Sequence, residues 1–503
     1  MATKMNKKMI FRSPLAVLLL AASMLGLGAV SLVSCGTSDQ KQPDNPDNQK
    51  NTTAETTAPV ETEALFDDEM PERDMNGFEL NILNYTETAL GWALKDINRT
   101  EETGDQVNDA IYARNRRIED RYNAVIKEEY NNDVINTFRN QVTAGAADFD
   151  IAQIYDMEAN NLNVSGTLLT WDHLPMVNLE KEWWNQDANA VFRIGDAQFA
   201  AVGDFNLSEY SKSYLYFFNK DLYKSLGFDD DLYQLVRDGK WTKDKLLSIA
   251  KDCAKDLNGD GKMDLEDQYG LAETAKIHYQ LLVTGAGYKY IDVGEDGIPY
   301  YAVSSNESLI SYMQELVNDH IDESWYYKSS EPNGAVPNEA FQPGHTLFVS
   351  STMWDTEKYR DYDFDIGILP APKADEAQKE YYTITIGGLV TVLPKTMAES
   401  DAENIGILLE SLAADSRYTC LPAYKEVTLQ SKYARDEGSA DMIDIIFNSQ
   451  TYDLGVTTWG EVRTNFSSLI FQKLNSDVVS TVAKYEKSVA KSIQKTIAAL
   501  EEQ

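Results

Sequence analysis

The segment from residue 256 to 267 carries the residues whose spacing is most specific for one kind of chemistry. Its sequence, DLNGDGKMDLED, puts oxygen-bearing side chains at positions 1, 3, 5, 9 and 12 and a glycine at position 6. This is the spacing of a calcium-binding EF-hand loop, in which position 7 ligates through its backbone carbonyl. The predicted Ca²⁺ ligands are Asp256, Asn258, Asp260, Lys262 through its carbonyl, Asp264 and Asp267. Because the last ligand is Asp where the motif has the longer Glu, a metal-free turn is the alternative.

Aromatic residues near the ends of predicted strands are the second group suited to chemistry. A Trp or Tyr ring stacks on the C–H face of a sugar ring, and neighbouring carboxylates and amides bind the sugar hydroxyls. The residues in question are Tyr85, Tyr155, Trp183, Trp184, Trp354 and Trp459. Core packing is the alternative for each of them, and it is the favoured role for Trp241, which precedes a predicted helix.

Motifs for covalent catalysis are missing from the sequence. It has no G-x-S-x-G segment, no P-loop and no H-E-x-x-H, and its 4 histidines are dispersed. A catalytic serine, a bound nucleotide and a zinc centre are therefore not expected, and neither is an organic cofactor. A pair of carboxylates acting on a glycan is not excluded in so acidic a chain. The expected class is a binding protein and not an enzyme, with a secreted carbohydrate-active enzyme as the alternative.

The first 35 residues predict a lipoprotein signal peptide. A basic front over residues 4–12 precedes an almost wholly apolar stretch over 15–33, and Leu32-Val33-Ser34-Cys35 resembles a bacterial lipobox. Cys35 would then carry the lipid, acyl chains such as palmitate, and hold the chain on the extracellular face of the bacterial cell membrane. A transmembrane anchor is the alternative, because the apolar stretch is nearly long enough to span a bilayer.

The amino-acid composition bounds the rest of the chain. Residues 36–76 are rich in Pro, Thr and acidic residues, which predicts a disordered tether. The formal net charge of -36 repels phosphate backbones, so a nucleic acid is not an expected partner. Apart from Cys35, only Cys253 and Cys420 are present. Buried free thiols are expected for this pair, and a bridge between them is the alternative.

Alternating strand and helix patterns begin at Gly77. Apolar residues at every second position predict strands, and apolar residues three to four apart after a capping Asp or Thr predict helices. In the first block the predicted elements are strands at 78–82, 125–126 and 149–154 and helices at 107–122 and 134–142. This β-α-β-α-β order is typical of a parallel sheet covered by helices.

A second block of the same character follows residue 210. It begins with a predicted strand over 214–218 and a helix capped by Thr242. The later predicted elements are helices at 306–318, 402–414, 440–448 and 477–501 and strands at 364–369 and 387–393. Two such blocks predict two lobes, because a body of about 425 residues exceeds what one simple core supports.

Short sequence blocks in a fixed order resemble the bacterial extracellular solute-binding proteins of family 1, the maltose-binding type. The blocks are AIYARN at 110–115, YNAV at 122–125, FDI at 149–151, FFNKDL at 217–222, GKWT at 239–242, DLNGDG at 256–261, DQYGL at 267–271, FDIGILPAP at 364–372 and TWGEVR at 458–463. The resemblance covers residues 77–503.

The resemblance implies an α/β structure of two lobes, the periplasmic-binding-protein type II fold, with a hinge and a ligand cleft between the lobes. The implied N-lobe spans 77–206 and 370–414, and the implied C-lobe spans 207–369 and 415–503. The residues implied as ligand contacts are Asn84, Tyr85, Tyr155, Asp156, Glu209, Tyr210, Trp354 and Trp459.

The function implied by the resemblance is that of a lipid-anchored receptor of an ABC importer. Such a protein works as a monomer, captures a solute and delivers it to a permease. A ligand that bridges both lobes binds the closed form better and shifts the hinge toward it. A sugar or oligosaccharide is the favoured solute because of the aromatic residues, and peptides and other polar solutes stay open.

Overall fold

The computed structural model describes residues 67–273, 275–328, 338–356, 358–430 and 437–501. The chain divides into two compact units, 1–61 and 62–503, and the fold below is that of the second unit. The predicted signal peptide, Cys35 and most of the predicted tether lie outside the described residues. In the part that is described, no helix is long and apolar enough to cross a membrane.

The N-lobe sheet has five strands in the order β2-β1-β3-β15-β4. Strand β1 pairs in parallel with both β2 and β3, whereas β15 runs antiparallel to β3. The strands are β1 (Phe78–Tyr85), β2 (Ala124–Asn131), β3 (Ile151–Tyr155), β4 (Leu168–Leu169) and β15 (Leu389–Pro394). The predicted β-α-β-α-β order is therefore confirmed, and β15 joins its sheet from far along the chain.

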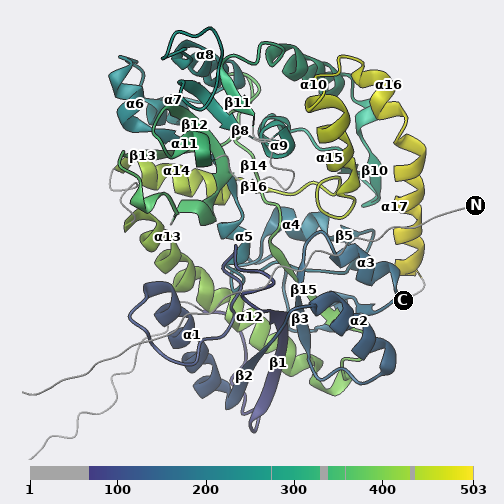
Figure 1. The fold of residues 1–503 in the computed structure, drawn as a ribbon. Coiled ribbons are helices and arrows are strands. Elements are labelled where there is room, and N and C mark those ends of the chain that lie inside the picture. The colour runs from purple at the N-terminus through teal and green to yellow at the C-terminus, as the bar shows by residue number, and fades with distance from the viewer. Residues whose placement is uncertain (1–66, 274, 329–337, 357, 431–436, 502–503) are drawn as a thin grey trace, which may run out of the picture. The chain divides into compact units, whose positions relative to one another are not determined.

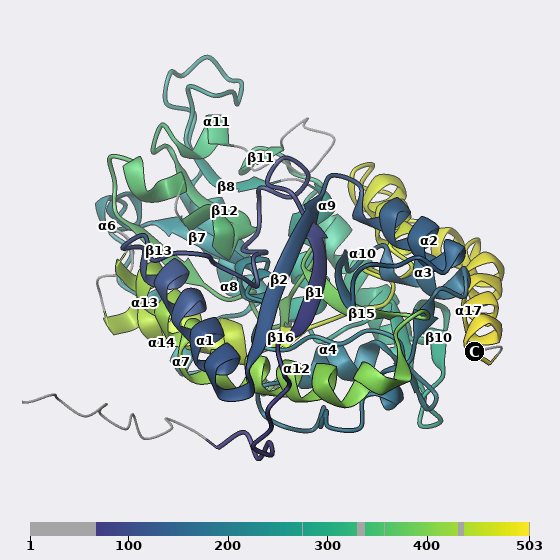
Figure 2. The ribbon, with the colours of Figure 1, turned by 90° about the horizontal axis from the view of Figure 1, so that it is seen from below.

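Helices cover both faces of the N-lobe sheet. Figure 2 shows α1 and α12 on one side of β1 and β2, and α2 and α3 on the other. Asp105 caps α1 by accepting from the Asn108 amide, as the sequence predicts. The helices of this part of the chain are α1 (Gln106–Tyr122), α2 (Val134–Ala144), α3 (Ala159–Val164), α4 (Gln186–Val191) and α12 (Ala402–Tyr418), with a small hairpin of β5 (Arg193–Ile194) and β6 (Ala197–Gln198).

The C-lobe sheet has five strands in the order β11-β8-β12-β7-β13. Its central strand β12 is buried along its whole length and runs antiparallel to β7 and parallel to β8. The strands are β7 (Tyr214–Asn219), β8 (Tyr269–Glu273), β11 (Tyr326–Lys328), β12 (Thr346–Thr352) and β13 (Ile366–Leu369), with a hairpin of β9 (Ile291–Val293) and β10 (Pro299–Tyr301). This sheet is mixed, and the sequence predicts only some of its strands.

The helices around the C-lobe sheet come mostly from residues between its strands. Figure 1 shows them in the half of the described region that holds β7, β8 and β12, away from β1 and β2. They are α6 (Lys220–Ser225), α7 (Leu232–Arg237), α8 (Lys243–Cys253), α9 (Ala275–Gly285), α10 (Glu307–Asp319), α11 (Asn338–Phe341), α14 (Glu437–Asn448), α15 (Glu461–Phe466) and α16 (Val478–Ala483). Cys253 and Cys420 are buried free thiols, so the bridge between them is not formed.

Two of the described connections join the two sheets. The first carries the short helix α5 (Ser208–Ser211) into β7, and the second leads from β13 through β14 (Thr383–Ile384) to β15. Strand β14 pairs in parallel with β16 (Gln450–Thr451), so the second connection is tied to the C-terminal segment. Figure 1 draws α5, β14 and β16 between the two sheets, where a hinge is expected.

Two helices in the segment implied as part of the C-lobe pack against N-lobe elements. Helix α13 (Cys420–Gln430), placed in the C-lobe by the sequence, packs against α1 beside the N-lobe sheet. The predicted helix over 477–501 is instead two helices, α16 and α17 (Glu486–Glu501). Helix α17 packs against both β10 and α3, along the side of the described region in Figure 1. The exact lobe boundaries stay a prediction.

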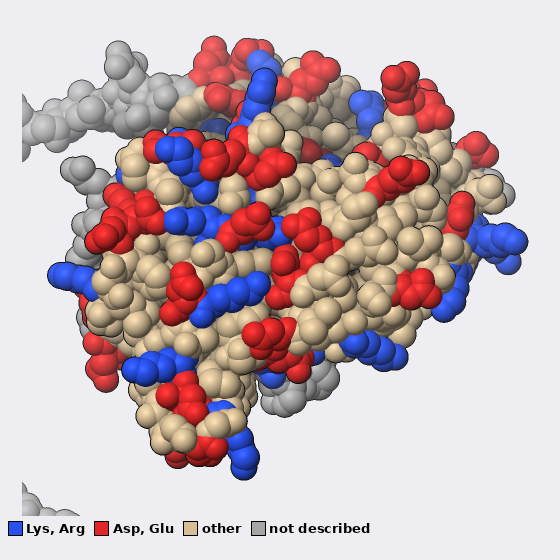
Figure 3. Space-filling view, turned by 90° about the horizontal axis from the view of Figure 1, so that it is seen from above, with Lys and Arg blue, Asp and Glu red and all other residues tan. Residues whose placement is uncertain are grey.

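Acidic and basic side chains are interspersed on the surface. Figure 3 shows them side by side over the face that it draws, without an extended basic area on that face. Several basic side chains pair with neighbouring carboxylates, such as Lys243 with Glu315 and Asp319. The exclusion of a polyanionic partner stays a prediction from the net charge of -36.

Candidate functional site

Ionisable residues gather where these two connections pass between the sheets. We call Asp156, Glu209, Lys212, Tyr214 and Arg463 the interlobe cluster. Asp156 follows the carboxyl end of β3, Glu209 and Lys212 lie in or just after α5, Tyr214 begins β7, and Arg463 lies in α15. Burial raises the pKa of Asp156, and the charges of Arg463 and Lys212 partly offset that rise. Burial also raises the pKa of Tyr214, and the charge of Asp156 adds to that rise. Elements of both lobes therefore meet at this cluster.

Asp156 is buried with only one of its two carboxyl oxygens engaged. Its Oδ2 accepts a hydrogen bond of 2.9 Å from the Gly387 amide, and its own amide donates to the Gly388 carbonyl over 3.0 Å. Its Oδ1 is buried without a hydrogen-bond partner. Burial raises the pKa of Asp156 from 3.8 to about 7, although the amides of Gly387 and Met157 and the charge of Arg463 favour the ionised form.

Glu209 repeats this half-satisfied arrangement. Its Oε2 accepts a hydrogen bond from the hydroxyl of Tyr452, whereas its Oε1 is buried without a partner. The carboxyl lies against the backbone of the second connection, because a Cβ on Gly388 would come within 2.5 Å of Oε1. Burial raises the pKa of Glu209 well above its ordinary value, and the hydrogen bond from Tyr452 opposes that shift.

Two cations of the cluster are also buried. Lys212 is 7% exposed and Arg463 is 4% exposed, and neither forms an ion pair within 4.0 Å among the described residues. The Nε of Arg463 has no hydrogen-bond partner. The Nζ of Lys212 lies 5.8 Å from the ring centre of Tyr214, and burial lowers the pKa of Lys212. Free donors and free acceptors are thus buried side by side, which an oxygen-rich solute would satisfy.

Tyr85 and Tyr155 are half-buried at the ends of β1 and β3 beside this cluster. The hydroxyl of Tyr85 lies 3.4 Å from the Tyr155 amide. The hydroxyl of Tyr155 lies over Gly387, whose φ is +83°, and a Cβ there would come within 2.8 Å of it. A glycine is therefore required at position 387 by both its backbone conformation and this close approach.

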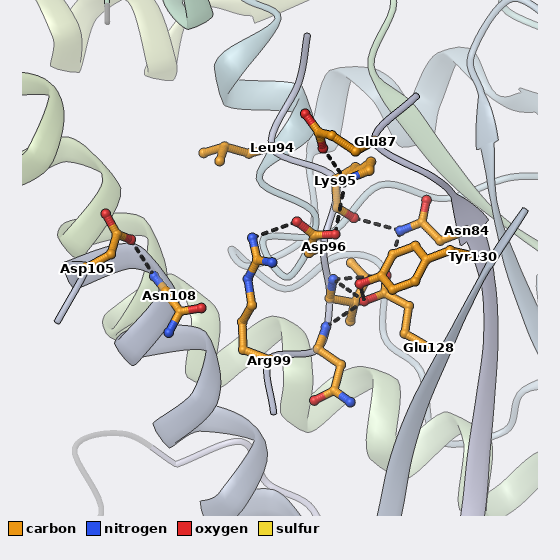
Figure 4. Close-up of polar contacts among 12 residues, drawn as sticks. Asn84, Glu87, Leu94, Lys95, Asp96, Arg99, Asp105, Asn108, Glu128 and Tyr130 are labelled. Atoms are coloured by element: carbon orange, nitrogen blue, oxygen red, sulfur yellow. Dashed lines mark hydrogen bonds and ion pairs between the residues drawn. The ribbon is translucent and has the colours of Figure 1, made fainter. Parts of the chain in front are cut away.

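Asn84 and Tyr210 have internal partners. Asn84 is fully buried and donates to the Lys95 carbonyl over 2.7 Å and to Glu128 Oε1 over 2.6 Å, so that it holds the loop after β1 in Figure 4. The hydroxyl of Tyr210 donates to Asp204, and its ring packs on Phe447. The contacts of Asn84 and Tyr210 are all within the protein, so both residues have a structural role.

The tryptophans divide between packing and the site. Trp183 and Trp184 are buried and both donate to Glu410, over 2.8 and 2.9 Å, which confirms packing for this pair. Trp241 is buried and donates to the Pro370 carbonyl over 2.9 Å.

Trp354 and Trp459 differ in their exposure. Trp354 is half-buried directly after β12. Trp459 is buried in the core, but its Nε1 has no partner, so it offers a donor and no exposed ring face. The turn that holds Trp459 and Gly460 lies against Met157, just after the end of β3. A Cβ added to Gly460 would come within 3.2 Å of Met157 Cε.

Sequence reasoning did not single out Lys212, Arg463 or Tyr452. Arg463 ends the TWGEVR block at 458–463, and Lys212 follows Glu209 by three residues, but each is an ordinary charged residue by local pattern. Only the fold shows that both are buried and that Tyr452 bonds to Glu209.

The 256–267 loop satisfies its acidic side chains with its own backbone. Asp256 accepts from the amides of Gly259 and Gly261, and Asp267 accepts from those of Leu257 and Asp264. Within the described ranges no group of three or more His, Cys, Asp or Glu side chains converges to hold a metal ion. In this conformation the carboxylates of the loop accept hydrogen bonds from its backbone amides and do not converge on one point.

Comparison with known proteins gives the identity of the fold. No protein-family model matches the chain, and no curated protein matches it. Similar solved structures include the cyclic α-maltosyl-1,6-maltose-binding protein of Arthrobacter globiformis, 15% identical with a TM-score of 0.55 over 83% of this chain and 99% of that one. The galacto-N-biose-/lacto-N-biose I-binding protein of a Bifidobacterium longum ABC transporter is 10% identical, with a TM-score of 0.53 over 84% and 98% of the two chains.

A third similar structure differs in its ligand. UgpB from Mycobacterium tuberculosis, solved in complex with glycerophosphocholine, is 13% identical with a TM-score of 0.51 over 83% of this chain and 99% of that one. All three neighbours are two-lobed binding proteins by fold. The chain thus has the two-lobed α/β fold that its sequence blocks imply.

Burial of Asp156 predicts a specific pH dependence of stability. Because its folded pKa of about 7 exceeds its ordinary value of 3.8, its contribution is complete below about pH 4 and is lost as the pH rises through about 7. Asp156→Asn should therefore reduce the fall in the free energy of unfolding between about pH 5 and 8 by about 2 kcal/mol, measured by urea denaturation. Asp120→Asn, at an exposed carboxyl on α1, is the control and should leave the fall unchanged. If Asp156→Asn loses as much unfolding free energy over this pH range as the unsubstituted chain does, a raised pKa at Asp156 is contradicted.

Proposed function

We propose that this chain is an extracellular solute-binding protein that captures a polar solute between its lobes and delivers it to the permease of an ABC importer. The observation that carries the proposal is the interlobe cluster, in which buried polar atoms from both lobes lack partners. Asp156 Oδ1 and Glu209 Oε1 have no partner, and each can accept a hydrogen bond when its carboxyl group is ionised or donate one when it carries the proton. Arg463 Nε is a donor without a partner. Because leaving such groups unpaired is costly, a bridging solute stabilises the arrangement in which the lobes meet.

A sugar or oligosaccharide is the solute that we favour. Tyr85, Tyr155 and Trp354 are half-buried aromatic side chains at the ends of strands around the cluster. Two of the similar structures are named for sugars that they bind. UgpB, with its different ligand, shows that the fold accommodates other polar solutes. The proposed contacts are therefore those of the interlobe cluster together with Tyr85, Tyr155, Trp354 and the indole N–H of Trp459.

The remaining features of the proposal come from the sequence. Cys35 would carry the lipid that anchors the chain on the outer face of the membrane, with residues 36–76 as the tether. We propose a monomer, since the hinge motion of one chain is sufficient for capture. Catalysis is not part of the proposal, because binding and closure need no nucleophile or acid–base pair.

A thermal-shift screen of the purified chain against mono- and oligosaccharides, with peptides as the comparison set, tests the proposed function. One sugar class should raise the melting temperature saturably and be recovered intact. Trp354→Ala should weaken that binding about 5- to 50-fold, equivalent to about 1–2.3 kcal/mol, through the loss of a stacking surface. Tyr300→Ala, at an exposed ring on β10, is the control.

Other outcomes of the screen have definite meanings. A cleaved sugar would favour the secreted carbohydrate-active enzyme. A shift with peptides alone would keep a receptor and replace the solute. Absence of any saturable ligand, sugar or peptide, would contradict the receptor itself.

We also propose that the 256–267 loop binds a structural Ca²⁺ after its carboxylates turn from the backbone amides to the ion. The spacing of Asp256, Asn258, Asp260, Asp264 and Asp267 supports this, together with the positive φ of Gly261 at position 6 of the loop. Added Ca²⁺ should raise the melting temperature of the metal-stripped chain, and EDTA should reverse the rise. Asp260→Asn should abolish the effect. No shift, with no metal found by elemental analysis, would refute the site.

A further inference from the structure

The two cations of the interlobe cluster lack the partners that the side chains of the other buried cations of the described region have. Lys212 and Arg463 are more than nine-tenths buried. Lys95 and Lys243, which are also buried, pair with carboxylates. The buried Arg114 and Lys373 form no ion pair with another described residue, but their side chains donate to backbone carbonyls. A buried charge without a partner is strongly unfavourable, so such a site is built for an anion that arrives from elsewhere.

The carboxyl groups around these cations already have other partners. Asp156 Oδ2 is held by the Gly387 amide and Glu209 Oε2 by the Tyr452 hydroxyl. Asp355, which also faces Lys212, accepts from the hydroxyls of Ser351 and Thr352 through its Oδ2. Burial moreover raises the pKa of Asp156 and of Glu209, which lowers the negative charge available to offset the two cations.

We propose that the solute carries an anionic oxygen group, a carboxylate or a phosphate on a sugar, and that Lys212 and Arg463 bind it. The inference rests on the proposed solute-binding function and names the chemical class of the solute. A guanidinium presents donors in a planar fork that matches two oxygens of such a group, and an ammonium adds a point charge.

The other free atoms of the site suit the hydroxyl groups of the same solute. Asp156 Oδ1, Glu209 Oε1, Trp459 Nε1 and Thr458 Oγ1 are buried and unpartnered. They mix acceptors and donors, as a polyhydroxylated ring requires. The site therefore divides into an anion-binding part, at Lys212 and Arg463, and a hydroxyl-binding part at the remaining atoms.

Matched pairs of sugars test this inference on the unsubstituted chain. Isothermal titration calorimetry compares glucose, galactose and their β-linked or α-linked disaccharides with glucuronate, galacturonate, digalacturonate, glucose 6-phosphate and galactose 6-phosphate. We expect an acidic member to bind about 10- to 100-fold more tightly than its neutral counterpart, as one charge-assisted contact provides. The uronate and phosphate arms distinguish the two sources of the anionic group.

Two substitutions then assign the effect to the cations. Arg463→Gln and Lys212→Met should each weaken binding of the acidic sugar about 10- to 100-fold more than they weaken binding of its neutral counterpart. Lys224→Gln, which removes one positive charge from an exposed position on α6, is the matched control and should change neither. If either variant fails to fold, the comparison of neutral and acidic sugars on the unsubstituted chain still decides.

The possible results separate this inference from the proposed function. Tighter binding of acidic sugars, lost in both variants, supports both. Equal or tighter binding of neutral sugars would overturn the anionic solute and leave the receptor intact. Loss of neutral and acidic binding in equal measure in both variants would overturn the assignment to the cations. Absence of binding by every sugar would overturn the inference together with the carbohydrate ligand.

Discussion

The burial of unpaired polar groups between the two sheets is the constraint on which the rest of the structure depends. Asp156 and Glu209 each use one carboxyl oxygen inside the protein and leave the other without a partner. Lys212 and Arg463 are buried nearby and form no ion pair with another described residue. Such groups raise the free energy of the protein alone, and this cost is recovered when a solute provides the missing partners. The same unpaired groups therefore lower the stability of the solute-free protein and raise its affinity for the solute.

The fold supplies the rigid supports for these groups. The carboxyl end of β3 carries Asp156, and the second connection presents its glycine backbone at 387–388 to both acids. Pairing of β14 with β16 brings Tyr452 to Glu209, so the hinge region and the site share residues. A change in the angle between the sheets would consequently alter the contacts of the site, which is the coupling that a closing receptor needs.

The sequence predicts the strands and helices that have strong local signals. The alternation at Phe78–Ile82 and the Asp105 cap correspond to β1 and α1 as observed. The mixed order of the C-lobe sheet depends on long-range pairing of β12 with β7 and β8, which local pattern does not encode. The break between α16 and α17 was missed because the helical periodicity continues across it.

The candidate site was predictable only in part for the same reason. Asp156, Glu209 and Tyr155 follow from sequence blocks and lie together in the structure. Asn84 comes from the same reasoning, yet the fold gives its amide to Lys95 and Glu128. Lys212 and Arg463 have no local signal, because their burial arises only when two segments 251 residues apart in the sequence meet.

The central claim is that a solute draws the two lobes together, and the distance between them tests it most directly. Spin labels at Lys127→Cys on β2 and Lys224→Cys on α6 report on the two sheets, since Cys253 and Cys420 are buried and should not react. Double electron–electron resonance should show the distance distribution shift and narrow when the solute found by the screen is added at saturation. An unchanged distribution with bound solute would contradict the account.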